Sequence, residues 1–87
     1  MPTTDALTDE DRLAIGRRLL SMREMFEYTQ AVVAERCYVS QPAVSAWERG
    51  VKIPARSTQH RLAELYRTQR SMLFVEIVRA EERAAAA

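Results

Sequence analysis

Apolar residues recur at helical spacing near the start of the chain. The residues that follow a 4-3-4 spacing there are Ile15, Leu19, Met22 and Phe26, and this spacing places them on one face of a helix. Thr8 is followed by three acidic residues, so a helix that begins there has a hydroxyl cap and negative charge in its first turn. The pattern predicts a helix over residues 9–26 and disorder over residues 1–7.

Two shorter helical segments follow. Thr29 can cap a helix that ends near Arg36, and Ser40 can cap a second one. Pro42 is tolerated in the first turn of that second helix, because those N–H groups have no acceptor within the helix. Gly50 is a natural stop. Residues 29–50 are therefore expected to form two helices joined by a tight turn, which is the layout of a helix-turn-helix.

The residue pattern in the C-terminal third predicts helices over residues 56–66 and 68–83, which could also form one continuous helix. The second of these carries an unusually wide apolar stripe, made of Met72, Leu73, Phe74, Val75, Ile77 and Val78. Surplus apolar surface of this kind suggests a partner. We interpret the stripe as a homodimer interface; the alternative is that this helix folds back and fills the core of its own chain.

Composition narrows the function classes. The chain is 47% hydrophobic and 29% charged, with only two Gly and three Pro, which favours a single all-α domain over residues 1–87. No apolar run approaches the roughly 20 residues of a membrane span, and no signal-peptide pattern opens the chain, so we expect a cytoplasmic protein. The chain has one cysteine, Cys37, and one histidine, His60. We therefore expect no disulfide and no metal site. We also expect no cofactor, no small-molecule ligand and no enzyme activity.

Charge is distributed unevenly. The net charge is +1, but residues 1–11 hold four acids and no base, and residues 71–87 hold two Arg and three Glu. Residues 12–70 hold eleven Arg or Lys against five Asp or Glu, a net +6. Because salt screens charge beyond about 10 Å, the local excess matters more than the total. The middle of the chain is thus basic enough to meet a phosphate backbone.

Residues 15–73 resemble the helix-turn-helix family of phage repressors and Cro proteins, most densely from Ile15 to Pro54. The resemblance is carried by Ile15-Gly16, Leu19, Arg23, Thr29-Gln30, Val33-Ala34, Val39-Ser40-Gln41, Val44, Trp47-Glu48-Arg49-Gly50 and Pro54. It implies a compact lambda-repressor-like domain of four to five helices, here with an extended C-terminal helix. It also implies that the helix over residues 40–49 enters the DNA major groove.

Within that helix, Val44 and Trp47 face the core, which leaves an outward face for DNA. The expected base-reading residues are Gln41, Pro42, Ser45 and Ala46. Gln41 is the strongest of them, because its amide can donate to and accept from the edge of adenine, whereas Pro42 and Ala46 can only meet a thymine methyl group. The expected DNA-backbone contacts are Gln30, Ser40, Arg49, Lys52 and Arg56. Gln30 can also brace the first reading side chain.

The resemblance assigns Arg23 and Glu48 to a structural ion pair between the first helix and the end of the reading helix. Two residues depart from the family pattern. Tyr38 stands where the family usually has Gly between the two helices, and Glu27 replaces the usual Gly before them. A residue with a side chain must there take a left-handed conformation, at a cost of order 1 kcal/mol, or reshape the turn.

The function expected is a sequence-specific regulator of transcription that binds double-stranded DNA, as a small repressor or Cro-like protein of phage or prophage type. A homodimer would read two half-sites about one helical turn apart. One alternative is the antitoxin of a toxin–antitoxin pair, with a protein partner on the C-terminal helix. Another is a protein-interaction module that keeps the fold but has lost DNA binding.

Overall fold

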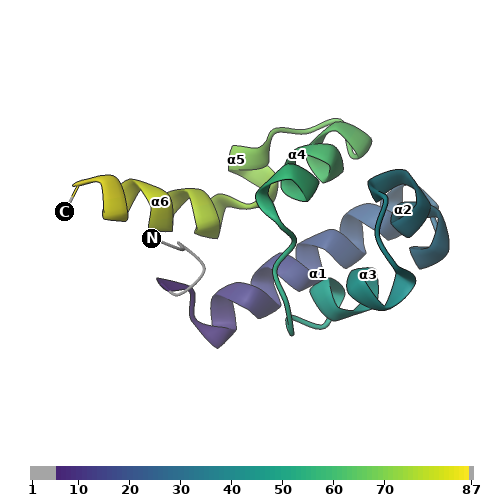
Figure 1. Ribbon diagram of the computed structural model, residues 1–87, viewed down its shortest axis with the longest axis horizontal. Coiled ribbons are helices and arrows are strands. Elements are labelled where there is room, and N and C mark those ends of the chain that lie inside the picture. The colour runs from purple at the N-terminus through teal and green to yellow at the C-terminus, as the bar shows by residue number, and fades with distance from the viewer. Residues whose placement is uncertain (1–5, 87) are drawn as a thin grey trace.

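The computed structural model describes residues 6–86, and within that range the chain is helical with no strand (Figure 1). The helices are α1 (Asp9–Met25), α2 (Gln30–Cys37), α3 (Gln41–Glu48), α4 (Arg56–Leu65), α5 (Arg70–Leu73) and α6 (Val75–Ala86). The predicted all-α fold class with a helix-turn-helix is confirmed. In place of the single helix predicted over residues 68–83, the structure has the two helices α5 and α6.

The start of α1 is closed by a capping box. The hydroxyl of Thr8 accepts a hydrogen bond from the Asp11 N–H at 3.0 Å, and the Asp11 carboxylate accepts one from the Thr8 N–H, also at 3.0 Å. Leu7, just before the cap, is 7% exposed and belongs to the core. The disorder predicted for residues 1–7 is therefore wrong for Leu7, because its apolar side chain has a core to enter. Residues 1–5 lie outside the described residues.

The helix-turn-helix is assembled from two hydroxyl caps and a short turn. The Thr29 hydroxyl accepts from the Val32 N–H at 3.1 Å, and the Ser40 hydroxyl accepts from the Ala43 N–H at 3.3 Å. These caps satisfy N–H groups that have no partner within α2 and α3. α3 packs against both α1 and α2 (Figure 1), so its orientation is set by two helices at once.

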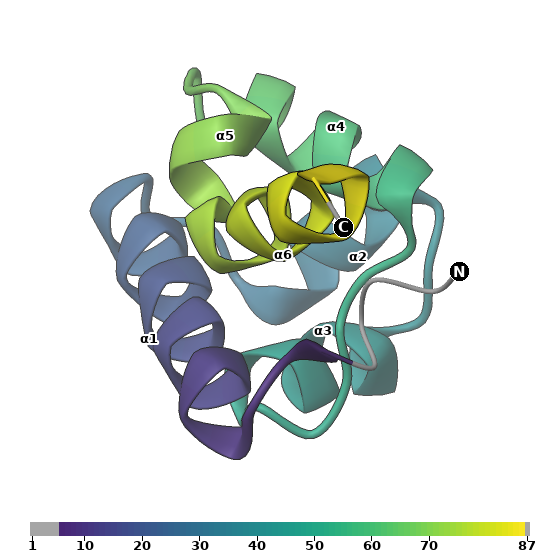
Figure 2. The ribbon, with the colours of Figure 1, turned by 90° about the vertical axis from the view of Figure 1, so that its left-hand side faces the viewer.

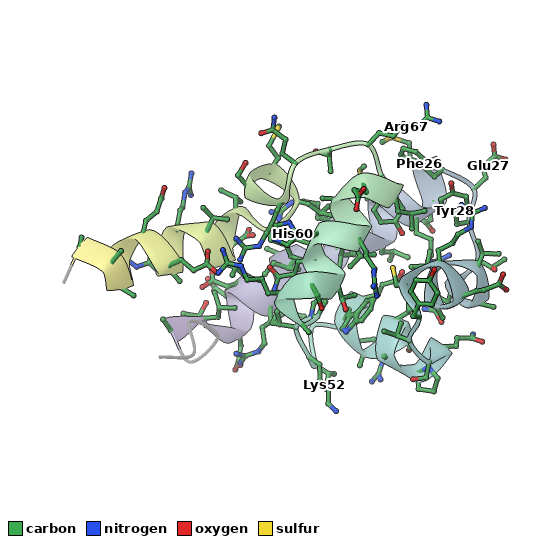
Figure 3. The ribbon with its side chains drawn as sticks, turned by 45° about the horizontal axis from the view of Figure 1, so that its top comes forward. Phe26, Glu27, Tyr28, Lys52, His60 and Arg67 are labelled. Atoms are coloured by element: carbon green, nitrogen blue, oxygen red, sulfur yellow. The ribbon has the colours of Figure 1, made fainter. Side chains whose placement is uncertain are left out.

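Helices α1 to α4 all end in the same left-handed turn. In each, two N–H groups beyond the helix bond back to carbonyls of its last turn, as Tyr28 does to Arg23 at 3.0 Å and Thr68 to Ala63 at 2.9 Å. The left-handed residues are Glu27 (φ 58°), Tyr38 (φ 58°), Gly50 (φ 74°) and Arg67 (φ 52°). Glu27 and Tyr38 therefore take the left-handed conformation rather than reshape the turn. Figure 3 shows Glu27 and Arg67 near the same end of the molecule.

The C-terminal region breaks at Phe74, whose backbone is not helical (φ −125°, ψ 44°). The break leaves the Leu73 carbonyl free to accept from Arg18 Nη1 at 2.8 Å. The same guanidinium donates to both carboxylate oxygens of Glu76, at 2.9 and 2.7 Å. One arginine of α1 thus ties down both sides of the break, which explains why α5 and α6 are separate helices.

The apolar stripe of the C-terminal region enters the chain's own core. Leu73, Phe74 and Ile77 are at most 2% exposed and pack with apolar residues of α1 to α4. Val75 and Val78 are half-buried, and only Met72 is largely exposed, at 66%. The interpretation of this stripe as a dimer interface is corrected on this point, since most of its surface is already covered. Figure 2 shows α6 in front, with α1 to one side and α4 and α5 above it.

The contact between α1 and α3 depends on Gly16. A Cβ atom at this position would lie 2.6 Å from the Glu48 carbonyl oxygen and 2.7 Å from that of Trp47. Both are backbone atoms at the end of α3, so they can give way only if the helix moves. Glycine therefore permits the close approach of the two helices.

We expect Gly16→Ala to lower the free energy of unfolding by about 1–3 kcal/mol or more, because the added methyl group overlaps backbone atoms. Urea denaturation measures the change. Ser21→Ala, at an exposed position of the same helix, is the control and should stay within about 0.5 kcal/mol of the wild type. A Gly16→Ala protein as stable as this control would contradict the close contact.

We expect Arg67→Gly to raise the free energy of unfolding by about 0.5–1 kcal/mol, because glycine adopts the left-handed conformation without a Cβ clash. Arg67→Ala keeps the Cβ atom and should bring no gain. Thermal denaturation of the two variants separates the backbone effect from loss of the arginine side chain. Equal stability of the glycine and alanine variants would refute a strained backbone at this turn.

Candidate nucleic-acid interface

The outward face of α3 is defined by the residues that anchor its inner face. Val44 and Trp47 are 1% and 5% exposed and belong to the core. On the other side, α3 and its C-cap present the predicted DNA-contacting residues Gln41, Pro42, Ser45 and Arg49, which line one shallow hollow together with Gln30 of α2. Residues 19 positions apart in the sequence thus share a single surface.

Ala46 does not belong to that surface. It is 8% exposed, and its carbonyl accepts from the N–H of Val51 at 2.9 Å, so the loop after α3 folds back at this position. The assignment of Ala46 to base reading is therefore wrong. The reason is the left-handed turn at Gly50, which returns the chain toward the last turn of α3 instead of leading it away.

Arg49 and Ser45 are coupled on the outward face. Arg49 Nε donates to the Ser45 hydroxyl at 3.3 Å, which one helical turn of separation allows. Arg49 is exposed and Ser45 half-buried. The contact uses the Nε–H of the guanidinium, so both terminal nitrogens of Arg49 are available to a phosphate or a base edge.

Glu48 joins the helices of the site from the inside. Its Oε2 accepts from Arg23 Nε at 2.7 Å and its Oε1 from Arg23 Nη2 at 3.1 Å. The side chains of Arg23 and Glu48 are only 17% and 6% exposed. Hydrogen bonding to Glu48 raises the pKa of Arg23 above its ordinary value. The structure thus places together the two residues assigned to the structural ion pair.

Gln30 is a third member of this group, through a hydrogen bond to Glu48 that the sequence does not predict. Gln30 Nε2 donates to Glu48 Oε1 at 2.9 Å. Because an ionised carboxylate only accepts, this bond fixes which end of the Gln30 amide faces inward. The amide oxygen is left to face away from Glu48. No spacing rule connects residues 18 positions apart, so nothing in the sequence signals this bond.

An aromatic cluster lies next to the ion pair. Arg23 Nη1 donates to the Tyr28 carbonyl at 3.1 Å, and the rings of Phe26, Tyr28 and Tyr66 lie within 6.4 Å of one another, centre to centre. Burial, followed by the negative charge of Glu48, raises the pKa of Tyr66 above its ordinary value. Tyr66 therefore stays neutral and adds no charge beside Glu48.

The residues predicted to contact the DNA backbone differ in whether their side chains already contact another part of the protein. Lys52 is exposed in the loop between α3 and α4 and projects away from the body of the molecule (Figure 3). It lines a second hollow with Arg12, which the sequence did not single out. The Ser40 hydroxyl caps α3. The Arg56 side chain is 67% exposed, but its Nη1 lies 3.3 Å from Glu81 of α6.

A metal cluster and a membrane span are both absent from the described part of the chain. Residues 6–86 contain no group of three or more His, Cys, Asp or Glu side chains that could hold a metal ion. None of the helices described is long and apolar enough to cross a bilayer.

We expect Glu48→Gln to destabilise the protein by about 3–5 kcal/mol, because it leaves Arg23 buried without a counter-charge. Replacing Arg23 and Glu48 together by Met should recover much of that loss, since no charge is then left unpaired. Asp9→Asn, which breaks the exposed pair with Arg12, is the control and should cost about 1 kcal/mol or less. A Glu48→Gln change as small as the control, measured by urea denaturation, would exclude a structural ion pair.

Comparison with known proteins agrees with this geometry. No curated protein matches the chain. A family model described as a helix-turn-helix domain matches residues 14–73, which is more than half of the chain and includes α2 to α5 and most of α1. The chain therefore belongs to this helix-turn-helix domain family.

Proposed function

We propose that the protein is a sequence-specific regulator of transcription that binds double-stranded DNA and inserts α3 into the major groove. The observation that carries the proposal is the shared hollow of Gln30, Gln41, Pro42, Ser45 and Arg49 on the outward side of α2 and α3. It gathers amide, hydroxyl and guanidinium groups on a helix that two other helices orient. Such a surface suits base edges and phosphates together.

Gln41 is the proposed reader of a base. It is exposed at the first residue of α3, and a glutamine amide can pair with the N6 and N7 atoms of adenine. Gln30 can brace it, because Glu48 holds the Gln30 amide with its oxygen available to accept from Gln41. Pro42 adds an apolar contact for a thymine methyl group.

The phosphate contacts are assigned to Gln30, Ser40, Arg49, Lys52 and Arg56, of which Gln30 and Arg49 line the same hollow as Gln41. With Ala46 withdrawn, Gln41 is the only long hydrogen-bonding side chain among the proposed base readers. Direct readout is therefore modest, and the shape and flexibility of the DNA supply part of the specificity.

We further propose that the protein acts as a small repressor or Cro-like switch of phage or prophage type, as a homodimer on two half-sites. Since Leu73, Phe74 and Ile77 are buried in the chain's own core, the proposed dimer contact does not include these three residues. The alternative is an antitoxin or an interaction module with a protein partner. It is favoured by the exposure of Met25 and Met72, at 69% and 66%.

Selection of bound duplexes from a random DNA pool by the full-length protein tests the proposal. We expect an enriched inverted repeat, whose half-site spacing would report the geometry of a homodimer. A single unrepeated site would uphold DNA reading and overturn the homodimer. No enrichment at low salt would overturn the DNA-binding regulator and leave the protein-partner alternative.

A matched pair of variants locates the reading residue. Gln41→Ala should weaken binding to the enriched site by about 1–3 kcal/mol for each half-site and relax the preference at one base pair. Gln69→Ala removes an exposed glutamine outside the site and should leave binding unchanged. If the two variants bind alike, Gln41 does not read a base.

A further inference from the structure

Arg56 is a proposed phosphate contact that also contacts the C-terminal helix α6. It is the first residue of α4 and follows the loop that carries Lys52. No side chain caps this helix, so the start of α4 keeps the positive end of its dipole unshielded by a capping group. Yet Arg56 Nη1 faces Oε2 of Glu81, 3.3 Å away in α6. The same guanidinium is thus in contact with a carboxylate of its own chain and is also a proposed phosphate contact.

Glu81 does not depend on Arg56 for its partners. Arg70 donates to both of its oxygens, from Nη1 at 3.0 Å and from Nη2 at 2.5 Å. Arg70 is also held by Gln59, whose Oε1 accepts from Arg70 Nε at 2.8 Å. The hydrogen bonds from Arg70 lower the pKa of Glu81 below its ordinary value. If Arg56 leaves, the carboxylate keeps a two-point pair with a charged partner.

The two arginines differ in how firmly they are held. The Arg70 side chain is 11% exposed, whereas that of Arg56 is 67% exposed and makes a single longer contact. Exposed one-point pairs contribute little to stability. Arg56 is therefore the detachable member of the cluster, and Arg70 the fixed one.

We propose that Glu81 competes with DNA phosphate for Arg56, so that the C-terminal helix holds back part of the affinity of the DNA surface. This inference rests on the proposed function. On DNA, the Arg56 guanidinium exchanges Glu81 for a phosphate oxygen, while Glu81 stays paired with Arg70. The exchange is an ion-pair swap in which no covalent bond changes.

Equilibrium binding of a mixed-sequence duplex of about 20 base pairs at low salt tests the competition, since phosphate contacts do not need a particular sequence. Glu81→Gln should tighten binding about two- to fivefold, the range of an exposed ion pair. Glu82→Gln removes the same charge from the neighbouring exposed position and should change binding less. In an Arg56→Ala background, Glu81→Gln should bring no gain beyond that of Glu82→Gln. Equal effects of the two glutamate variants in the wild-type background would overturn the competition.

A measurement on the wild-type protein covers the case in which Glu81→Gln fails to fold after losing its pair with Arg70. Addition of the same duplex should shift the Nε–Hε nuclear magnetic resonance of Arg56 and leave that of Arg70 in place. A duplex that binds without shifting Arg56 would overturn the inference but not the proposed function. A duplex that does not bind at all would overturn both.

Discussion

The position of α3 depends on one nearly buried carboxylate. Glu48 lies at the end of α3 and binds Arg23 of α1 and Gln30 of α2, so three helices meet at one charged group. Such a charge is tolerable in the interior only with partners on its oxygens. Gly16 makes the arrangement possible, because a larger residue would hold α1 away from the last turn of α3. The geometry of the proposed DNA surface thus depends on a structural ion pair on the other side of the same helices.

Local features of the fold could be predicted from the sequence because their causes are local. Thr8, Thr29 and Ser40 each close a helix start through a bond to an N–H three residues further on, and such spacing is visible in the residues alone. At Glu27 and Tyr38 the sequence alone cannot choose between a left-handed residue and a reshaped turn. In the structure both residues are left-handed. This conformation strains the backbone, but it lets both helix ends complete their hydrogen bonds.

Features that depend on tertiary contacts could not be predicted in the same way. Ala46 has the right spacing for the outward face, but the returning loop after Gly50 covers it. The stripe around Phe74 has too much apolar surface for a peripheral helix, and periodicity cannot tell a partner's core from the chain's own. Arg18 of α1 fixes this segment to its own chain by binding the Leu73 carbonyl and Glu76 across the break. That bond joins residues 55 positions apart, which no local pattern encodes.

The same internal pairing changes what the basic middle of the chain means for DNA. Residues 12–70 carry a net +6, but Arg12, Arg18, Arg23 and Arg70 each pair with a carboxylate of this chain. Among the residues proposed to meet phosphate, Arg49 and Lys52 have no such pair with any carboxylate of residues 6–86, and Arg56 has a weak one. Counterion release depends on the charges that reach phosphate, not on the charge of a segment. Under the proposed function, affinity for the duplex would rest on a few side chains around α3, and an acidic side chain that holds one of them would have a proportionally large effect.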